Sequence, residues 1–209
     1  MKTRKPFILG VNGSPRKRGR IATMLTRVLR EVERKGGRTR AIHLADYQIF
    51  PPSGKLDRRV SIEHTRDDMP KLQRLVLEAD GIVFATPAHW FNMSAHLKLF
   101  LDRLTSLEHH SFLLEGKAAG FVIYGPQGGA MSATMLLLTI VNQMGMIFPP
   151  YAAIVDEGRG DKWSRREEYR MLTKNMLQLI RAGKEMKFNW GYPGEPYEMS
   201  PIELLKKKK

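Results

Sequence analysis

Apolar and polar positions follow two distinct spacings along the chain, and each spacing predicts a type of secondary structure. Short apolar runs bounded by turn-forming residues are typical of buried strands, whereas apolar residues three and four positions apart indicate amphipathic helices. Five runs fit the strand pattern, at residues 5–11, 40–44, 81–86, 118–124 and 146–155. Five segments fit the helix pattern, at 21–32, 67–79, 93–104, 131–144 and 164–184.

Individual residues refine several of these elements. Asp67 and Asp68 are suited to cap the amino end of the second helix. Pro149 and Pro150 are expected to bulge the fifth strand or to confine its pairing, because proline has no N–H to donate. Periodicity fails between residues 46 and 66, which predicts a long loop. The last helix is predicted to direct one face inward: Tyr169, Leu172, Met176, Leu179 and Ile180.

The alternation of strands and helices predicts the fold class. Such a chain forms a parallel sheet with helices on both faces, since parallel strands need long crossover connections. Right-handed crossovers make a doubly wound, three-layer α/β domain the simplest arrangement. Ligands of these sheets bind beyond the carboxyl ends of the strands, near the point where the strand order reverses. The loops after the first, third and fourth strands are therefore the candidate site.

Length and composition limit the possible classes of protein. The 209 residues fit one domain, which we place at 1–188, followed by a C-terminal extension or arm at 189–209. The chain has no cysteine, which excludes disulfides, thiolate metal sites and a cysteine nucleophile. No apolar stretch approaches the roughly 18 residues of a membrane helix. We expect a soluble, cytoplasmic protein that does not act at a membrane.

The charge is strongly positive, but it is concentrated at the two ends. The net charge is +14, and residues 1–20 contain seven Lys or Arg residues and no acidic residue. Lys206–Lys209 add four more cations, which leaves only +3 on the other 185 residues. Binding to duplex nucleic acid usually needs a continuous basic face. Nucleic-acid binding through the basic ends is therefore the less favoured alternative.

The loop after the first strand, residues 13–20, combines glycines with four cations at the start of a helix. Backbone N–H groups and the dipole of a helix amino end favour a phosphate. Ser14 adds a hydroxyl group, and Arg16 can contact phosphate oxygens through its planar guanidinium. The alternative is a solvated basic turn without a ligand.

The loop after the third strand, residues 86–94, brings a histidine and two large aromatic side chains to the end of a buried strand. Exposed aromatic rings are costly unless they pack on a flat ligand or on a partner chain. Asn92 and Ser94 could hydrogen-bond the polar edge of a heteroaromatic ring. The alternative assigns Trp90 and Phe91 to core packing or to a subunit contact.

The loop after the fourth strand, residues 124–130, contains three glycines before a helix. Glycine permits positive φ angles and a close approach of the backbone to a ligand. Alone, this loop is equally consistent with an ordinary strand-to-helix turn. Because all three loops are expected at the same edge of the sheet, the sequence favours one binding site that they share.

Five segments, taken together in their order and spacing, resemble the flavodoxin-like NADPH-dependent FMN reductase family, near its iron–sulfur flavoprotein branch. They are Gly13-Ser14-Pro15-Arg16, Asp67-Asp68-Met69, and residues 79–87, 90–98 and 100–104. The resemblance covers most of residues 6–155. It implies a flavodoxin-like three-layer sandwich around a five-stranded parallel sheet in the order 2-1-3-4-5.

The resemblance also implies a cofactor site for FMN. The first loop would hold the FMN phosphate, and the loops at 87–93 and 125–129 would hold the isoalloxazine. The cofactor-binding residues that we expect are Ser14, Arg16, Arg20, Ile21, Pro87, Ala88, His89, Trp90, Phe91, Asn92, Met93, Tyr124, Gly125, Gln127, Gly128 and Gly129.

The chain departs from the family pattern at three places. Gly19-Arg20-Ile21 stands where relatives have Gly-Asn-Thr, so we expect Arg20 to replace the lost hydroxyl and amide donors with charge. Residues 49–66 lack the clustered cysteines of the iron–sulfur branch, which excludes that cluster and leaves a flavin-only electron route. His89 stands where tyrosine is common.

By this resemblance the chain is an FMN-dependent oxidoreductase. It would pass electrons from NAD(P)H to a small acceptor such as a quinone, a nitro or azo compound, or another flavin. Trp90 and Phe91 would shape the acceptor site and His89 is the candidate proton donor, with no catalytic triad and no metal. Covering segments at 46–66 and 189–209 lead us to expect a homodimer or homotetramer. A non-enzymatic flavin- or nucleotide-binding regulator is the alternative.

Overall fold

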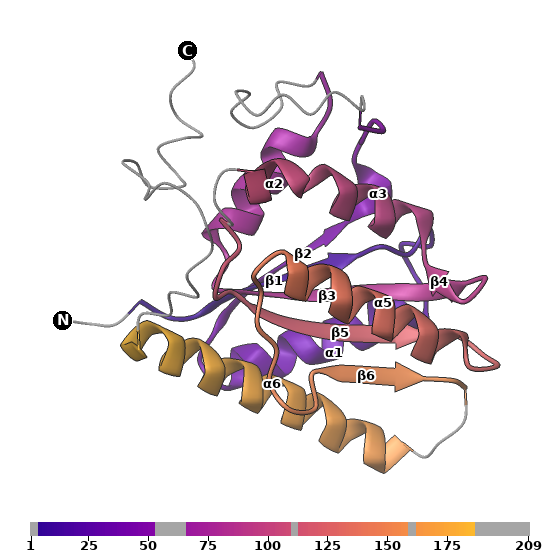
Figure 1. Cartoon of the computed structure of the whole chain (residues 1–209). Helices are drawn as coiled ribbons and strands as arrows, with labels where there is room; N and C mark the ends of the chain where they lie inside the picture. Colours follow the sequence, from indigo (N-terminus) through magenta and orange to yellow (C-terminus); the bar gives the residue numbers. More distant parts are fainter. Residues whose placement is uncertain (1–3, 53–65, 110–112, 159–161, 187–209) are drawn as a thin grey trace, which may run out of the picture.

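The computed structural model describes residues 4–52, 66–109, 113–158 and 162–186. Its centre is a sheet in which five parallel strands follow the order β2-β1-β3-β5-β6 (Figure 1). Counted along the chain, these are the predicted five strands in the predicted order 2-1-3-4-5. Their bounds are β1 (Phe7–Asn12), β2 (Arg38–His43), β3 (Gly81–His89), β5 (Ala118–Tyr124) and β6 (Ala153–Asp156).

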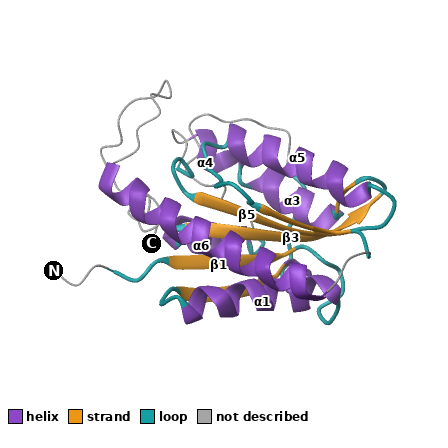
Figure 2. Ribbon diagram, turned by 90° about the horizontal axis from the view of Figure 1, so that it is seen from below, coloured by secondary structure: helices purple, strands orange, loops and turns teal. Residues whose placement is uncertain are grey.

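Helices cover both faces of this sheet, as the alternating pattern predicts (Figure 2). One face carries α1 (Arg20–Arg34) and α6 (Lys162–Met186), and the other carries α2 (Met69–Glu78), α3 (Ala95–Arg103) and α5 (Gly129–Gln143). A short 3₁₀ helix (Leu44–Asp46) follows β2, and α4 (Thr105–His109) follows α3. None of the helices in the described part of the chain is long and apolar enough to span a membrane.

The strands supply both hydrophobic cores because successive side chains point to opposite faces of a sheet. Ile8 and Val83 pack in the cluster under α1 and α6, whereas their neighbours Leu9 and Ile82 pack in the cluster under α2, α3 and α5. The long apolar runs of the sequence thus reflect strands that are buried on both sides. In α6 the predicted inward positions are buried except Leu179, which is only partly covered.

Three local expectations need correction. The segment expected to begin a helix at Met93 first forms a two-residue strand, β4 (Asn92–Met93), antiparallel to β3. The fifth strand is shorter than predicted, because Pro149 and Pro150 separate an isolated bridge at Ile147 from β6. Asp68 occupies the N-cap position of α2 without capping it through its side chain.

Asp67 binds the first N–H of α2, as predicted, whereas Asp68 binds the segment before the helix. Asp68 accepts a hydrogen bond from the Gln48 N–H at 3.0 Å, while Asp67 accepts one from the Met69 N–H at 3.1 Å. Asp67 also forms a fully buried ion pair with Arg103 of α3, at 2.6 Å. The same Arg103 guanidinium donates to the Phe50 carbonyl at 2.6 Å. This ion pair fastens the segment before α2 to the end of α3.

Candidate functional site

Residues from all three predicted loops line one pocket at the carboxyl edge of the sheet. Its volume of about 400 Å³ falls within the range of roughly 300–1,000 Å³ that is usual for small-molecule sites. The β1–α1 loop contributes Ser14, Pro15, Arg16, Arg18, Gly19, Arg20 and Ile21, the end of β3 contributes Pro87, Ala88 and His89, and the β5–α5 loop contributes Tyr124, Gly125 and Pro126.

Hydrogen bonds shape the β1–α1 loop. The Asn12 Oδ1 accepts from the Ser14 N–H at 2.8 Å, and the Ser14 Oγ accepts from the Arg16 N–H at 3.1 Å. Helix α1 then begins after Gly19, without a side chain that caps it. The first N–H groups of a helix have no acceptor within that helix. The pocket therefore borders a helix end that favours an anion.

Two arginines add positive charge to this helix end. Arg16 and Arg18 are exposed and line the pocket. Within the described residues, neither of them forms an ion pair. Lys17 between them pairs with Asp46 instead. The charge of Arg16 and Arg18 is thus available to a ligand.

Arg20 lies in a different environment from the one expected of a phosphate ligand. Its Nε and Nη2 donate to the two carboxylate oxygens of Asp156, at 2.7 and 3.1 Å. Its guanidinium lies over the Tyr124 ring, 4.5 Å from the ring centroid. The buried Asp156 also binds Arg165 at 2.9 Å. Arg20 is therefore a paired wall residue, and Arg16 and Arg18 are better placed to supply charge.

The β3–β4 hairpin carries the two aromatic residues on a strained turn. Trp90 and Phe91 have φ angles of 48° and 61°, and the flanking residues His89 and Asn92 pair across the hairpin. Positive φ at both central positions defines the type I′ turn, in which Asn-Gly is preferred and bulky residues are rare. Trp90 is 95% exposed and Phe91 56% exposed, so these rings do not belong to the core.

The β5–α5 loop packs closely against the end of β3. A Cβ atom at Gly125 would lie 2.4 Å from the Ala88 Cβ, a distance that real side chains do not adopt. Gly128 has φ of 77° and occupies the N-cap position of α5. Glycine is thus required at position 125 for the close approach and favoured at 128 for the backbone angle. These contacts hold the third loop at the pocket.

Nine of the sixteen predicted cofactor residues line the pocket: Ser14, Arg16, Arg20, Ile21, Pro87, Ala88, His89, Tyr124 and Gly125. Trp90, Phe91, Asn92, Gln127, Gly128 and Gly129 belong to the same two loops but do not line it, and Met93 is buried in the core. Four lining residues were not predicted: Pro15, Arg18, Gly19 and Pro126. Their positions within the same loops are the signal that could have identified them.

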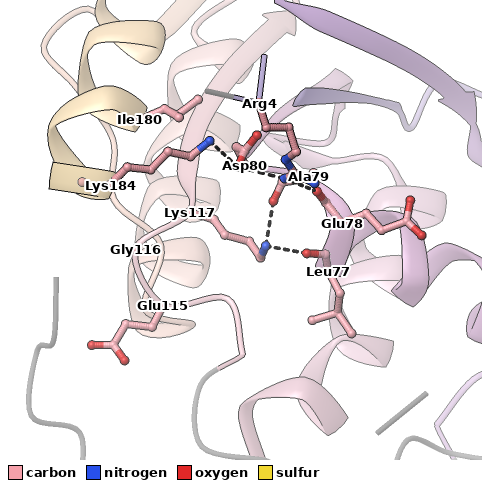
Figure 3. Close-up of a pocket in the computed structure, with 11 residues that line it drawn as sticks. Arg4, Leu77, Glu78, Ala79, Asp80, Glu115, Gly116, Lys117, Ile180 and Lys184 are labelled. Carbon is pink, nitrogen blue, oxygen red and sulfur yellow. Dashed lines mark hydrogen bonds and ion pairs between the residues drawn. The ribbon is translucent and has the colours of Figure 1, made fainter. Parts of the chain in front are cut away.

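A second pocket, of about 380 Å³, lies at the amino edge of the sheet (Figure 3). Lys117 donates from Nζ to the carbonyls of Leu77 and Ala79, at 2.8 and 2.6 Å, and so satisfies the last turn of α2. Burial lowers the pKa of this amine to about 8. Asp80 pairs with Lys184 and Arg4, at 3.0 and 3.2 Å. These contacts are those of a structural helix cap rather than of a reactive amine.

Metal binding has no support in the described ranges. No group of three or more histidine, aspartate or glutamate side chains there could hold a metal ion. The polar groups at the candidate site are cations, N–H donors and hydroxyls, which suit an anion.

Comparisons with known proteins identify the relatives of this chain. It is 31% identical over 148 residues to an iron–sulfur flavoprotein of Archaeoglobus fulgidus, a match that covers 69% of this chain and 66% of that protein. The matched segment thus spans just under two thirds of that relative's length. A second relative, an NADPH-dependent FMN reductase of Pseudomonas putida, is 29% identical over 100 residues, covering 47% of this chain and 46% of that protein.

Solved structures agree on the fold. The crystal structure of RosB with the bound intermediate 8-demethyl-8-formylriboflavin-5'-phosphate matches with a TM-score of 0.77 and 20% identity, over 92% of this chain and 95% of that chain. The apo form of the NADH:FMN oxidoreductase EmoB matches with a TM-score of 0.63 and 19% identity, over 91% and 97%. The model of the family named NADPH-dependent FMN reductase matches residues 6–160, and the chain belongs to this family.

Proposed function

We propose that the pocket at the carboxyl edge of the sheet binds FMN and that the chain is an NAD(P)H-dependent FMN oxidoreductase. The observation that carries this proposal is the meeting of three loops in one pocket that borders the amino end of α1. When bound, FMN supplies the redox chemistry, accepting a hydride from NAD(P)H and reducing a small acceptor such as a quinone, a nitro or azo compound, or a flavin. A cytoplasmic location is part of the same proposal.

The residues present fit the phosphate of such a cofactor. The first N–H groups of α1 would donate to its oxygens, and Arg16 and Arg18 would neutralise its charge. The Ser14 Oγ, which already accepts from the Arg16 N–H, still has its own proton to donate. This phosphate site would depend mainly on cations and backbone groups, with Ser14 as its hydroxyl donor.

The other end of the pocket fits a flat ring. Ala88 and Gly125 approach each other so closely that they form a continuous wall from β3 to the β5–α5 loop. His89 lies exposed at the rim, where it is our candidate for donating a proton to a reduced acceptor. Trp90 projects beyond this rim and would limit which acceptors can stack on the ring.

The exposed aromatic turn also supports a homo-oligomer, a dimer or a tetramer. Phe91 lies beside the start of α5, because a Cβ atom at Gly129 would be 3.9 Å from the Phe91 Cα. Met131 and Met135 of α5 are further exposed apolar side chains, with 52% and 63% exposure. Large exposed apolar side chains on neighbouring elements are typical of a subunit interface, and we assign them to contact with a second copy of the chain. Residues 53–65 and 187–209, which include most of the segments expected to cover a neighbour and the boundary at 188, lie outside the described residues.

Sedimentation or light scattering tests this assignment. The wild type is expected to form a dimer or tetramer at micromolar concentration, and Met135→Glu to shift it towards the monomer. Thr26→Glu, at an exposed threonine of α1 on the opposite face of the sheet, is the matched control for added charge. A monomeric wild type would contradict the proposed interface without affecting the proposal for FMN.

Flavin binding and reduction test the main proposal. The purified chain is titrated with FMN and with riboflavin, and binding is followed by quenching of flavin fluorescence. Replacing both Arg16 and Arg18 with alanine is expected to raise the Kd for FMN about tenfold and to leave the Kd for riboflavin unchanged, because riboflavin lacks the phosphate. Arg74→Ala, an exposed arginine on α2, serves as the matched control.

Anaerobic addition of NADH or NADPH to the FMN-loaded chain then tests the reaction. Loss of the oxidised flavin spectrum is the expected result. Failure to bind FMN at all would overturn the proposal. Tight binding without reduction by either nucleotide would instead support the non-enzymatic, flavin-binding alternative.

A further inference from the structure

A third cavity, with a strongly basic lining, lies between α1 and α6, which run side by side on one face of the sheet (Figures 1 and 2). Its volume is about 580 Å³, and we call it the α1–α6 groove. Its lining includes two carboxylates, Glu31 and Asp156, against six arginines: Arg20, Arg27, Arg30, Arg34, Arg165 and Arg166. The groove therefore has a clear surplus of positive charge.

Half of these arginines form ion pairs within the protein, and two carboxylates serve all three of them. Asp156 binds both Arg20 and Arg165, at 2.7 and 2.9 Å. Glu31 binds Arg34 at 2.5 Å.

The other three arginines, Arg27, Arg30 and Arg166, have no carboxylate partner among the described residues. Arg27 lies over the Tyr169 ring that lines the groove, with its Cζ 5.9 Å from the ring centroid. Like charges gathered on two adjacent helices repel each other unless an anion lies between them. Guanidinium groups match phosphate oxygens particularly well, because two parallel N–H donors reach two oxygens.

The position of the groove relative to the candidate FMN pocket indicates which phosphate it would take. Arg20 lines both cavities, so the groove begins where the pocket ends. Arg27 and Arg30 lie two and nearly three helical turns further along α1, about 10 and 15 Å from Arg20. A ligand with its reactive ring at the pocket and an extended nucleotide tail would bring its far phosphate to these residues.

We propose that the α1–α6 groove binds the adenosine-phosphate end of NADPH, with the 2'-phosphate against Arg27 and Arg30. This inference rests on the proposed function, because it assigns a place to the electron donor of that reaction. NADH lacks the 2'-phosphate, so the groove makes NADPH the preferred donor. The contact is a phosphate monoester held by guanidinium groups, without any covalent step.

Binding of nucleotide fragments tests the groove independently of flavin and turnover. Calorimetric titration of the full chain compares adenosine 2',5'-bisphosphate with adenosine 5'-monophosphate, and the bisphosphate is expected to bind at least tenfold more tightly. Arg30→Ala, which removes no contact seen within the described residues, is expected to weaken the bisphosphate about tenfold without affecting the monophosphate. Arg27→Lys keeps the charge and isolates the contribution of the planar guanidinium. Arg74→Ala on α2 is the matched control.

Three results would overturn the inference. One is equal binding of the two nucleotides by the wild type. Another is an unchanged Kd in Arg30→Ala. The third is displacement of the bisphosphate by inorganic phosphate or by a single-stranded oligonucleotide at lower concentration, which would identify a general anion site or a nucleic-acid site.

Steady-state kinetics separate this inference from the proposed function. In the FMN-loaded enzyme, Arg30→Ala is expected to raise the KM for NADPH about tenfold while leaving kcat and the KM for NADH unchanged. Reduction by both nucleotides with no effect of the variant would refute the groove and leave the oxidoreductase intact. A chain that binds the bisphosphate but no FMN would refute the oxidoreductase and leave the groove.

Discussion

The buried amine of Lys117 gives a prediction whose sign and size follow from the structure. Its Nζ lies at the last turn of α2, where it donates to the carbonyls of Leu77 and Ala79. Burial lowers the pKa of Lys117 from its ordinary value of 10.5 to about 8, although the nearby Asp80 carboxylate opposes this shift. A neutral amine still has two N–H groups, so both hydrogen bonds can persist after deprotonation.

The shift links the stability of the chain to pH. Between pH 8 and pH 10.5 the unfolded chain still holds a proton that the folded chain has lost, so the free energy of unfolding rises with pH over this window. Below pH 8 both states are protonated, and the full cost of burying the charge, about 3 kcal/mol, is present. Above pH 10.5 this cost is absent.

Urea unfolding of the wild type and of Lys117→Met at several pH values between 7 and 10 measures this effect. The difference in the free energy of unfolding, wild type minus variant, is expected to rise by about 2–3 kcal/mol over that range. Other titrating groups cancel in the difference. The variant also leaves two carbonyls without their donor, which changes the offset but not the slope. Lys71→Met is the control. The hydrogen bond to Asp68 raises the pKa of the exposed Lys71 amine, so this group stays above the pH range of the experiment. The difference in the free energy of unfolding between wild type and Lys71→Met is therefore expected to be independent of pH. If the difference between wild type and Lys117→Met is also independent of pH, the predicted effect of burying the Lys117 amine is refuted.

Three further predictions concern the fold and the site. Arg103→Met removes the Arg103–Asp67 ion pair, which is fully buried, and is expected to lower the free energy of unfolding by about 3–5 kcal/mol in urea titrations. A loss below about 1 kcal/mol would contradict this. Gly125→Ala forces the backbone away from Ala88 and is expected to raise the Kd for FMN and for riboflavin equally, about tenfold or more; unchanged affinities would show that the two loops are not in contact. Trp90→Asn places at the turn a residue that tolerates positive φ, so it is expected to stabilise the chain by up to about 1 kcal/mol. A thermal melt measures this effect. A lower melting temperature of the variant would mean that the exposed ring of Trp90 makes a stabilising contact.

The sheet could be predicted from the sequence because its strands are buried on both faces. Such strands produce continuous apolar runs, and residues 118–124 were predicted with the bounds that β5 has. The meeting of three loops could be predicted as well, because all carboxyl ends of parallel strands lie at the same edge. Neither inference needs knowledge of any individual side-chain contact.

The β3–β4 hairpin could not be predicted, because its turn lacks the usual sequence signal. Trp90-Phe91 replaces the Asn-Gly type of dipeptide that this turn geometry favours. Met93 has a buried side chain in either case, so its apolar character could not distinguish a strand from the first turn of a helix. The ion pair between Asp67 and Arg103 was equally invisible, because its partners are far apart in the sequence.

The distribution of charge around the site depends on a contact between distant parts of the chain. Arg20 is one of four cations in the β1–α1 loop, and the sequence predicts phosphate binding for it as for its neighbours. In the structure, however, Asp156 at the end of β6 binds Arg20. Because Arg20 lines both cavities, its pairing divides the positive surface into two parts, one with Arg16 and Arg18 and one with Arg27 and Arg30. In the proposed reaction, FMN and NADPH both carry phosphate and must meet at the flavin ring. The Arg20–Asp156 pair would then separate the site proposed for the FMN phosphate from the site proposed for the 2'-phosphate of NADPH.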